Sequence, residues 1–255
     1  MIRAVLFDLF DTLVDLPWTE LPRHRVGGRS IPTTAGVIHA ALRRHAEVDF
    51  ETFAKALADV DRLRGLERAA EGHEFPTLER FARLLSRLAI PDPAGVLAGE
   101  LTEAHMGVLV GLARAPAHHA ALLTTLRRRV RLGLCSNWSW TPSALAILEN
   151  TRLRESFDAL AISHDVGLRK PRPEIFRAAL SQLGVEPHEA LHVGDNLAAD
   201  VVGAAALGIG TVWLTRRVPD LAAARARTPE ARPDWTISDL AELDAILAGD
   251  AGTQR

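Results

Sequence analysis

The chain has 255 residues, of which 47% are apolar and 24% charged, a composition typical of a soluble globular protein and not of a disordered, fibrous or membrane protein. Its 30 basic and 32 acidic side chains give a formal net charge of −2, so no excess of cations is present to neutralise a nucleic-acid backbone, and we expect a small-molecule ligand. Cys135 is the only cysteine, which excludes a disulfide within the chain and favours a reducing compartment.

The first predicted element is a short strand near the N-terminus. Residues 2–7 form a largely apolar run that stops at Asp8, as a strand buried in a parallel sheet would. The run is too short for a signal peptide and far below the roughly 20 residues of a membrane helix. We therefore expect a cytoplasmic protein that does not associate with membranes.

Residues 15–114 are predicted to form a helical domain. Their apolar residues recur at helical spacing, which predicts four helices, over 33–46, 50–70, 77–88 and 95–112. The Pro-, Gly- and Arg-rich segment 21–32 contains no convincing strand and is predicted to be a loop. Hinges are expected near residues 14–17 and 114–117, where this domain joins the rest of the chain.

Strands and helices alternate through the rest of the chain. The predicted strands are 132–136, 159–163, 190–194, 211–215 and 235–238. The predicted helices are 117–130, 142–150, 173–183, 197–207 and 239–247. This alternation predicts an α/β fold, in which residues 1–14 and 115–255 form a doubly wound, Rossmann-like parallel sheet and residues 15–114 form an inserted α-helical cap.

Polar residues follow several of the predicted strands. Asp8, Ser136, Ser163 and Asp195 stand at or just after strand ends, and Lys170 lies in the loop after the third strand. Ligands of open α/β sheets bind at the carboxyl ends of the strands. We therefore expect several of these side chains to converge on one site.

Four separated motifs in this order resemble the haloacid dehalogenase (HAD) superfamily, whose fold is such a sheet with a helical cap inserted after the first strand. They are FDLFDTL at residues 7–13, LCSN at 134–137, KPRPEIF at 170–176 and VGDNLAAD at 193–200. The similarity extends over nearly the whole chain. It implies a hydrolase with an aspartate nucleophile.

The resemblance implies that Asp8 is the nucleophile and that Mg²⁺ is bound by Asp8, the backbone carbonyl of Phe10 and Asp195. It leaves Asp200 as a metal ligand, an outer-sphere residue or a partner of Lys170. An aspartate is already ionised at neutral pH and can attack without a separate base. Lys170 is expected to offset the repulsion between this carboxylate and an anionic substrate, and it is one of only two lysines in the chain, the other being Lys55.

Three further residues are candidates for substrate binding together with Lys170. Ser136 and Asn137 end the strand that follows the cap, where a hydroxyl and backbone N–H groups can bind an oxyanion. Thr12 can offer its hydroxyl to the same phosphate or cap the turn after the first strand.

The first motif departs from the pattern of the family's phosphatases, which carry a second aspartate two residues after the nucleophile as general acid and base. Phe10 occupies that position, and Asp11 is one residue further on. Family members that dehalogenate 2-haloacids have an aromatic residue there, because a halide leaves without a proton. We expect either Asp11 or a cap residue to replace the missing acid, or substrates that do not need one.

Three functions stay open at this point. The acidic motif at Asp195 and Asp200 favours a Mg²⁺-dependent phosphatase of a small phosphate ester, acting through an aspartyl-phosphate. The first alternative is a 2-haloacid dehalogenase that acts through an aspartyl ester. The second alternative is a non-catalytic binding protein on the same fold. Neither the physiological substrate nor the choice between monomer and homodimer follows from the sequence.

Overall fold

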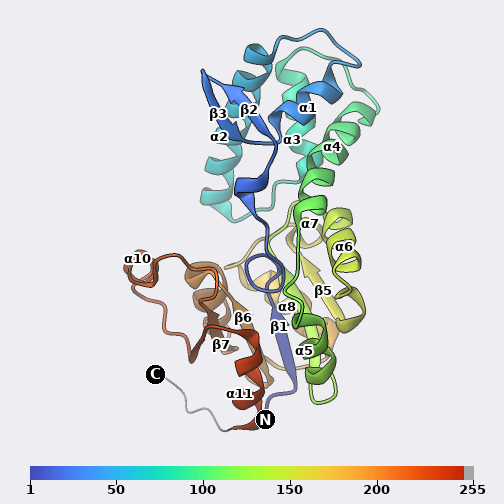
Figure 1. Cartoon of the computed structure of the whole chain (residues 1–255). Helices are drawn as coiled ribbons and strands as arrows, with labels where there is room; N and C mark the ends of the chain where they lie inside the picture. Colours follow the sequence, from blue (N-terminus) through green and yellow to red (C-terminus); the bar gives the residue numbers. More distant parts are fainter. Residues whose placement is uncertain (250–255) are drawn as a thin grey trace. The chain divides into compact units, whose positions relative to one another are not determined.

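The computed structural model describes residues 1–249, with residues 68–71 described for the backbone alone. The chain forms two compact units (Figure 1). The first contains Met1–Asp15, Arg114–Trp138 and the chain from Leu148 onward, and the second contains Leu16–Ala113 and Ser139–Ile147. The second unit thus takes in residues 139–147, which the sequence-based division places in the core domain.

A six-stranded parallel sheet forms the centre of the first unit, which confirms the predicted fold class. Its strands are β1 (Ala4–Phe7), β4 (Arg131–Ser136), β5 (Ala159–Ile162), β6 (Ala190–Gly194), β7 (Gly210–Leu214) and β8 (Trp235–Ile237). They lie in the order β5-β4-β1-β6-β7-β8, with β1 parallel to both β4 and β6. The chain leaves β1 for β4 on one side and returns to β6 on the other, so the strand order reverses beside β1, where such sheets bind ligands.

Helices cover both faces of this sheet. They are α5 (His119–Leu126), α7 (Ser163–Val166), α8 (Pro173–Leu183), α9 (Gly203–Ala205), α10 (Leu221–Arg227) and α11 (Leu243–Ala248). In Figure 1, α5 and α11 lie in front of the sheet and α8 lies behind it. Helix α8 buries Phe176, Ala179 and Leu183 against β4 and β5. The predicted helix 197–207 begins as a π-helical turn over Leu197–Val202, whose first N–H groups are capped by the side chain of Asn196.

The second unit contains the four predicted helices, one hairpin and most of α6 (Thr141–Asn150). The helices are α1 (Ala35–Leu42), α2 (Phe50–Glu71), α3 (Thr77–Arg87) and α4 (Val96–Leu112), and the hairpin strands are β2 (Arg23–Val26) and β3 (Arg29–Pro32). Side chains of all four helices share one apolar core, which includes Ile38, Phe53, Phe81 and Leu101.

The hairpin corrects the prediction of a loop over residues 21–32. Gly27 and Gly28 both have positive φ values, 54° and 78°, which suits the two-residue turn that joins antiparallel strands. Along β2 the arginines are exposed while His24 and Val26 are partly buried, and the His24 ring packs 4.0 Å from the ring of Phe50. The strand was missed because its inward residues are a histidine and a single valine rather than a run of apolar residues.

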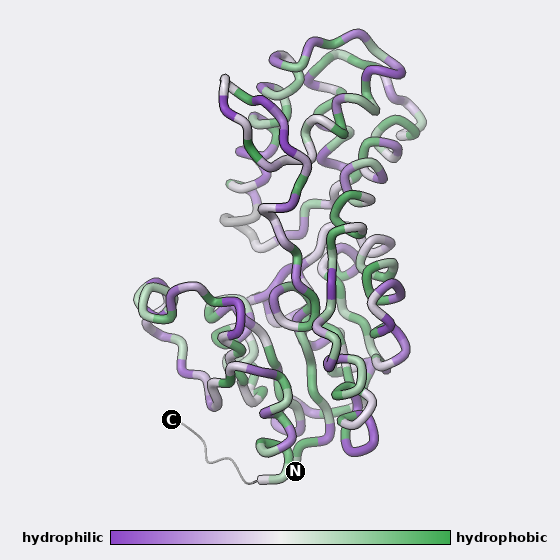
Figure 2. Tube along the Cα trace, in the orientation of Figure 1, coloured by the Kyte–Doolittle hydropathy of each residue, from purple (hydrophilic) through white to green (hydrophobic). Residues whose placement is uncertain are grey.

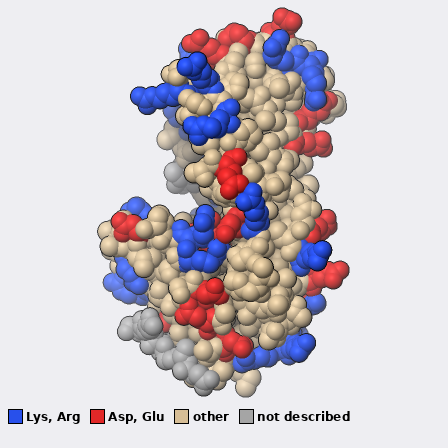
Figure 3. All heavy atoms as spheres, viewed as in Figure 1, with Lys and Arg blue, Asp and Glu red and all other residues tan. Residues whose placement is uncertain are grey.

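Hydropathy and charge follow this architecture. The strands of the sheet are mostly hydrophobic in Figure 2, and their side chains form the buried core of the first unit. On the face shown in Figure 3, acidic and basic side chains are intermixed over both units, in keeping with the small net charge. None of the helices in the described part of the chain combines the length and the apolar character needed to cross a membrane.

A histidine in the second unit predicts a specific acid sensitivity. Burial, reinforced by the charges of Arg80 and Arg64, lowers the pKa of His105 from 6.5 to about 3, while its Nδ1 lies 2.8 Å from the Thr34 hydroxyl. Between these two pKa values the unfolded chain takes up a proton that the folded chain does not, so stability falls as the pH falls through this window. We expect a loss of at most about 2 kcal/mol on going from neutral pH to about pH 5.

The His105→Gln variant tests this assignment, because glutamine keeps a polar side chain but does not titrate. Urea unfolding of both proteins at the two pH values measures the effect. The variant should lose less stability on acidification than the wild-type protein. Equal losses in the two proteins would show that another group is responsible.

Candidate active site

A pocket of about 220 Å³ opens at the carboxyl ends of the central strands, next to the reversal of strand order. It is lined by Asp8, Phe10, Asp11, Ser136, Asn137, Arg169, Lys170, Asp195, Asn196, Ala199 and Asp200. Seven of the eight predicted site residues are therefore brought together. The exception is Thr12, which is fully buried and does not line the pocket.

An aspartate and a lysine meet at the base of this pocket. Asp8 directly follows β1, and its backbone N–H donates to the carbonyl of Val193 on the neighbouring strand, at 2.9 Å. The Lys170 ammonium donates to Asp8 Oδ1 at 2.7 Å, and both residues are buried. Burial raises the pKa of Asp8 to about 6 against the opposing charge of Lys170, so the carboxylate is still mostly ionised at neutral pH.

Lys170 is held in place from both ends. Its backbone N–H donates to Asn137 Oδ1 at 2.7 Å, and Asn137 Nδ2 donates to its carbonyl at 3.0 Å. The ammonium also donates to Asp200 Oδ1 at 2.7 Å. Burial lowers the pKa of Lys170, but the charges of Asp200 and Asp8 outweigh burial and raise it, so the ammonium stays charged.

Both carboxylate oxygens of Asp200 accept hydrogen bonds from other groups of the protein. Besides Lys170, Asp200 accepts from His192 Nε2 at 2.9 Å and from the backbone N–H of Asn196 at 3.0 Å. Burial favours its neutral form, but Lys170 and His192 outweigh burial and hold its pKa below the usual range. Of the three roles left open for Asp200, the geometry is that of a partner of Lys170.

The backbone of Gly194 makes room for this carboxylate. A Cβ at Gly194 would lie 2.2 Å from Cγ of Asp200, far inside any allowed contact. The glycine that ends β6 is therefore required for Asp200 to reach back to Lys170. This requirement explains on steric grounds why the second position of the motif Val193-Gly194-Asp195 is a glycine.

Asp195 is the carboxylate without a cation. No ion pair or hydrogen bond to its side chain is found within residues 1–249, whereas its backbone carbonyl accepts from Trp213 Nε1 at 2.8 Å. Burial, followed by the charges of Asp8, Asp200 and Asp11, raises the pKa of Asp195 to about 8. Ionisation of Asp195 at neutral pH therefore needs positive charge beyond that of Lys170.

The donor atoms suit a hard divalent cation. One carboxylate oxygen from each of Asp8, Asp195 and Asp200 lies within 4.8 Å of the others. Mg²⁺ prefers such oxygen ligands and commonly takes only one or two carboxylates, with water and substrate phosphate filling the rest. The residues present therefore fit the cation implied by the sequence motifs, with Asp8 and Asp195 better available than Asp200.

Ser136 offers a hydroxyl to a ligand. The residue ends β4, is almost fully buried and lines the pocket, yet its Oγ has no hydrogen-bond partner in the described part of the protein. An unsatisfied buried hydroxyl costs on the order of 1–3 kcal/mol. A phosphate or carboxylate oxygen in the pocket is the partner that would remove this cost.

Phe10 gives one wall of the pocket an apolar surface. Its ring packs against the Trp138 ring with 4.2 Å between centroids, so neither side chain can donate or accept the proton of a leaving group. The next residue, Asp11, has a positive φ of 56° and also lines the pocket. Its Oδ1 lies 3.5 Å from Arg217 Nε, and burial raises its pKa.

Sequence reasoning missed several residues of this site. His192 lies in the middle of a buried strand, and a histidine within the run Ala190-Leu191-His192-Val193 was the one available signal for it. Arg169 precedes Lys170 and Arg217 follows β7, but an arginine in a loop carries no signal of its own in a chain with many arginines. Arg23, Arg25 and Arg29, in the segment that was predicted to be a loop, are exposed on the hairpin of the second unit.

Comparison with known proteins agrees with this geometry. The family model of the haloacid dehalogenase-like hydrolases matches residues 2–208. Among curated proteins, the glyceraldehyde 3-phosphate phosphatase of Pyrococcus abyssi is 32% identical over 84% of this chain and 81% of its own length. The phosphoserine phosphatase of Thermus thermophilus is 31% identical over 94% of this chain and 97% of its own length.

The same fold is found among solved structures. The 2-haloacid dehalogenase of Pseudomonas syringae pv. Tomato superposes with a TM-score of 0.70 over 98% of this chain and 100% of its own, at 23% identity. That likeness concerns the fold, whereas the family match covers all four motifs that build the pocket. The chain therefore belongs to the haloacid dehalogenase-like hydrolases.

Proposed function

We propose that this hydrolase is a Mg²⁺-dependent phosphatase of small phosphate esters that acts through an aspartyl-phosphate on Asp8. The observation that carries the proposal is the excess of carboxylates in the pocket, where Asp195 has a raised pKa and makes no ion pair among residues 1–249. A dehalogenase does not need such a charge arrangement. The two curated relatives are named as phosphatases of glyceraldehyde 3-phosphate and of phosphoserine, which supports the same class of substrate.

In the proposed reaction, an Asp8 carboxylate oxygen attacks the phosphorus of the bound ester. The bond from phosphorus to the ester oxygen breaks as the new bond forms, and the leaving group departs as an oxyanion that takes a proton from solvent water. Water then attacks the aspartyl-phosphate, which releases inorganic phosphate and returns the Asp8 carboxylate. Asp8 can begin this cycle without a base because it is ionised at neutral pH.

The protein contributes positioning and charge. Lys170 is fixed through Asn137 and Asp200 and places its ammonium 2.7 Å from the nucleophile, where it offsets part of the repulsion between Asp8 and the phosphate. That repulsion is on the order of 4 kcal/mol for each pair of charges at 4 Å in an effective dielectric of 20. Asp8 and Asp195 would hold a Mg²⁺ ion, which would supply the remaining positive charge.

The leaving group defines the preferred substrate. Phe10 presents an apolar ring where the phosphatases of this family place a proton donor. General acid catalysis is typically worth about 10²–10⁴-fold, and most so for alcohols that are poor leaving groups. We therefore propose that phosphates with good leaving groups, such as aryl or acyl phosphates, are hydrolysed best.

The test is hydrolysis of p-nitrophenyl phosphate by the purified full chain, with and without Mg²⁺. We expect EDTA to lower the rate by at least about 100-fold, since it removes several kilocalories per mole of charge stabilisation, and added Mg²⁺ to restore it. Ca²⁺ serves as the control for Mg²⁺, because it carries the same charge but prefers more ligands at longer distances. A rate that is indifferent to EDTA would refute the Mg²⁺-dependent phosphatase.

A second candidate function rests on the same Phe10. A halide needs no proton on departure, so a 2-haloacid dehalogenase acting through an aspartyl ester on Asp8 is compatible with an aromatic wall at this position. Chloride release from 2-chloropropionate, independent of metal, is its expected signature. If no chloride is released with or without EDTA, this candidate is eliminated.

A further inference from the structure

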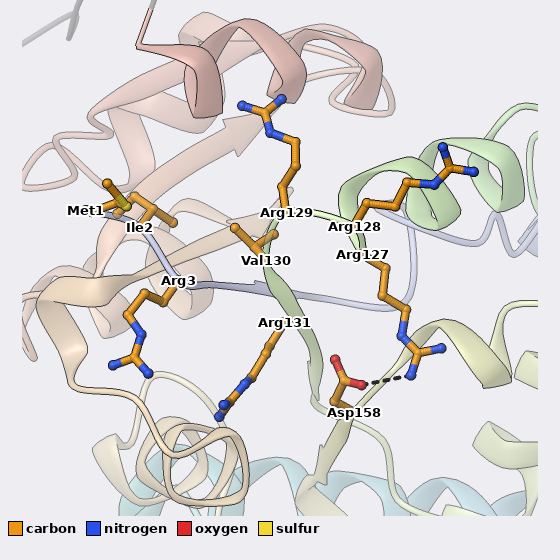
Figure 4. A pocket seen from close by; sticks show the side chains of 9 residues that line it. All are labelled: Met1, Ile2, Arg3, Arg127, Arg128, Arg129, Val130, Arg131 and Asp158. Atoms are coloured by element: carbon orange, nitrogen blue, oxygen red, sulfur yellow. Dashed lines mark hydrogen bonds and ion pairs between the residues drawn. The ribbon is translucent and has the colours of Figure 1, made fainter.

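The polar side chains at the two ends of the sheet are arranged differently. Around a pocket of about 410 Å³ at the amino ends of β1 and β4, Arg128 and Arg129 extend to one side of the segment that enters β4, and Arg131 extends to the other (Figure 4). At the carboxyl ends the side chains converge instead. His192 belongs to that converging cluster, although the proposed attack by Asp8 makes no direct use of it.

His192 is a polar residue at a position that favours apolar side chains. It is the third residue of β6, which lies between β1 and β7, and it is 1% exposed. The Phe176 ring packs perpendicular to it, with 5.1 Å between the ring centroids. Its Nδ1 has no hydrogen-bond partner in the part of the chain that the structure describes, and a buried polar atom without a partner lowers stability. Leucine would avoid that cost, so packing alone does not account for the histidine.

The other ring nitrogen of His192 faces Asp200. His192 and Gly194 are two residues apart in β6, so they face the same side of the sheet, where Asp200 lies against Gly194. His192 Nε2 lies 2.9 Å from Asp200 Oδ1. Because Asp200 is ionised and can only accept, the proton of the ring lies on Nε2. Burial lowers the pKa of His192, so the ring is a neutral donor.

One carboxylate oxygen joins this histidine to the lysine of the active site. Asp200 Oδ1 accepts from His192 Nε2 and also from the Lys170 ammonium, at 2.7 Å. The second oxygen, Oδ2, accepts from the backbone N–H of Asn196 at 3.0 Å. Two donors besides Lys170 therefore fix the rotation of the Asp200 carboxylate, and His192 is the one that acts on the oxygen shared with Lys170.

We propose that His192 is a positioning residue that aligns Lys170 with the nucleophile through the shared oxygen of Asp200. The inference rests on the proposed phosphatase, in which Lys170 offsets the repulsion between Asp8 and the phosphate. His192 does not line the active-site pocket, so it acts through Asp200 and not on the substrate. A catalytic group that is displaced by about 1 Å can lose on the order of 10²-fold in rate, which makes such alignment important.

The His192→Leu variant separates positioning from a structural role. Leucine removes both the donor and the unpartnered Nδ1, and Asp200 stays paired with Lys170, so no buried charge loses its partner. We expect kcat for p-nitrophenyl phosphate at saturating Mg²⁺ to fall by at least about 10-fold, more than any change in KM. The midpoint of urea unfolding should not fall. A merely structural histidine would give the reverse, a lower midpoint with wild-type kcat.

Two further variants show whether the donor is the cause. His192→Gln places an amide nitrogen at the same number of bonds from the backbone as Nε2, and it should recover most of the lost rate. His188→Leu, the same change as His192→Leu at an exposed histidine of the same unit, is the matched control and should keep wild-type kcat. Glutamine and leucine variants that are equally slow would contradict a role for the donated hydrogen bond.

A double-mutant cycle tests the route through Asp200. Asp200→Asn leaves Lys170 paired with Asp8, and its rate provides the second background. If His192 acts through Asp200, adding His192→Leu to Asp200→Asn should lower kcat by less than about twofold. The same fold-loss in both backgrounds would show that His192 acts by another route and would overturn the assignment.

The wild-type rate distinguishes failure of this role from failure of the proposed function. If the wild-type protein shows no Mg²⁺-dependent hydrolysis, the phosphatase itself is refuted. If it hydrolyses the ester and folded His192→Leu has the same kcat, the positioning role alone is refuted and the phosphatase stands.

Discussion

Replacement of Asp8 by asparagine should abolish hydrolysis of p-nitrophenyl phosphate, with a loss of roughly 10⁴-fold or more. The amide has nearly the shape of the carboxylate but cannot form the aspartyl-phosphate. The loss should appear in kcat, since the nucleophile acts in the chemical step. Initial rates at saturating Mg²⁺ and substrate measure it directly.

The variant should fold, which makes the comparison meaningful. Lys170 keeps its ion pair with Asp200 at 2.7 Å when Asp8 is neutralised, so no unpaired buried charge is created. Urea unfolding of Asp8→Asn checks this point. Asp165→Asn, which removes an exposed carboxylate from the same unit, is the matched control and should retain activity. A folded Asp8→Asn protein with near wild-type activity would eliminate the proposed nucleophile.

Phe10→Asp should extend the range of substrates to alkyl phosphates. An aspartate at this position introduces a proton donor at the pocket, and we expect the rate for alkyl esters to rise by roughly 10²–10⁴-fold. The rate for p-nitrophenyl phosphate should change much less, because its leaving group needs little protonation. The ratio of kcat/KM for glycerol phosphate to that for p-nitrophenyl phosphate measures the effect.

Asparagine provides the control for this substitution. Phe10→Asn loses the same contact with Trp138, which is worth about 1 kcal/mol, but has no proton to donate. A rise shared by both variants would point to pocket size rather than acid catalysis. If Asp11 already donates the proton, Asp11→Asn will slow the wild-type reaction on alkyl esters and Phe10→Asp will add little.

The location of the pocket was predictable because strand ends in a parallel sheet share one edge. Asp8, Ser136 and Asp195 end buried apolar runs, and the order of the runs places them beside the central strand. Ser163 also follows a strand, but β5 is at the margin of the sheet, and its hydroxyl donates to the carbonyl of Trp138 at 3.2 Å instead of lining the pocket. Ser163 differs from the other three residues because its strand lies farther from the point where the strand order reverses.

The contacts that tune the site were not predictable. Asn137 uses its side-chain amide on the Lys170 backbone, 33 residues away, a contact that the sequence did not suggest, and donation from its backbone N–H to the substrate stays a prediction. The partner of His192 is also set by packing, since its ring reaches Asp200 from within the strand. Such pairings depend on side-chain direction in three dimensions, which hydrophobic periodicity does not encode.

The contact between Gly194 and Asp200 limits how this chain can diverge. Any single replacement of the glycine introduces a methyl group or more where the carboxylate lies 2.2 Å away, so variants at position 194 are viable only after position 200 has become smaller. In a saturation library, replacements of Gly194 should therefore be tolerated only together with a smaller residue at position 200. Descendants that acquire a different chemistry are expected to abandon both residues together.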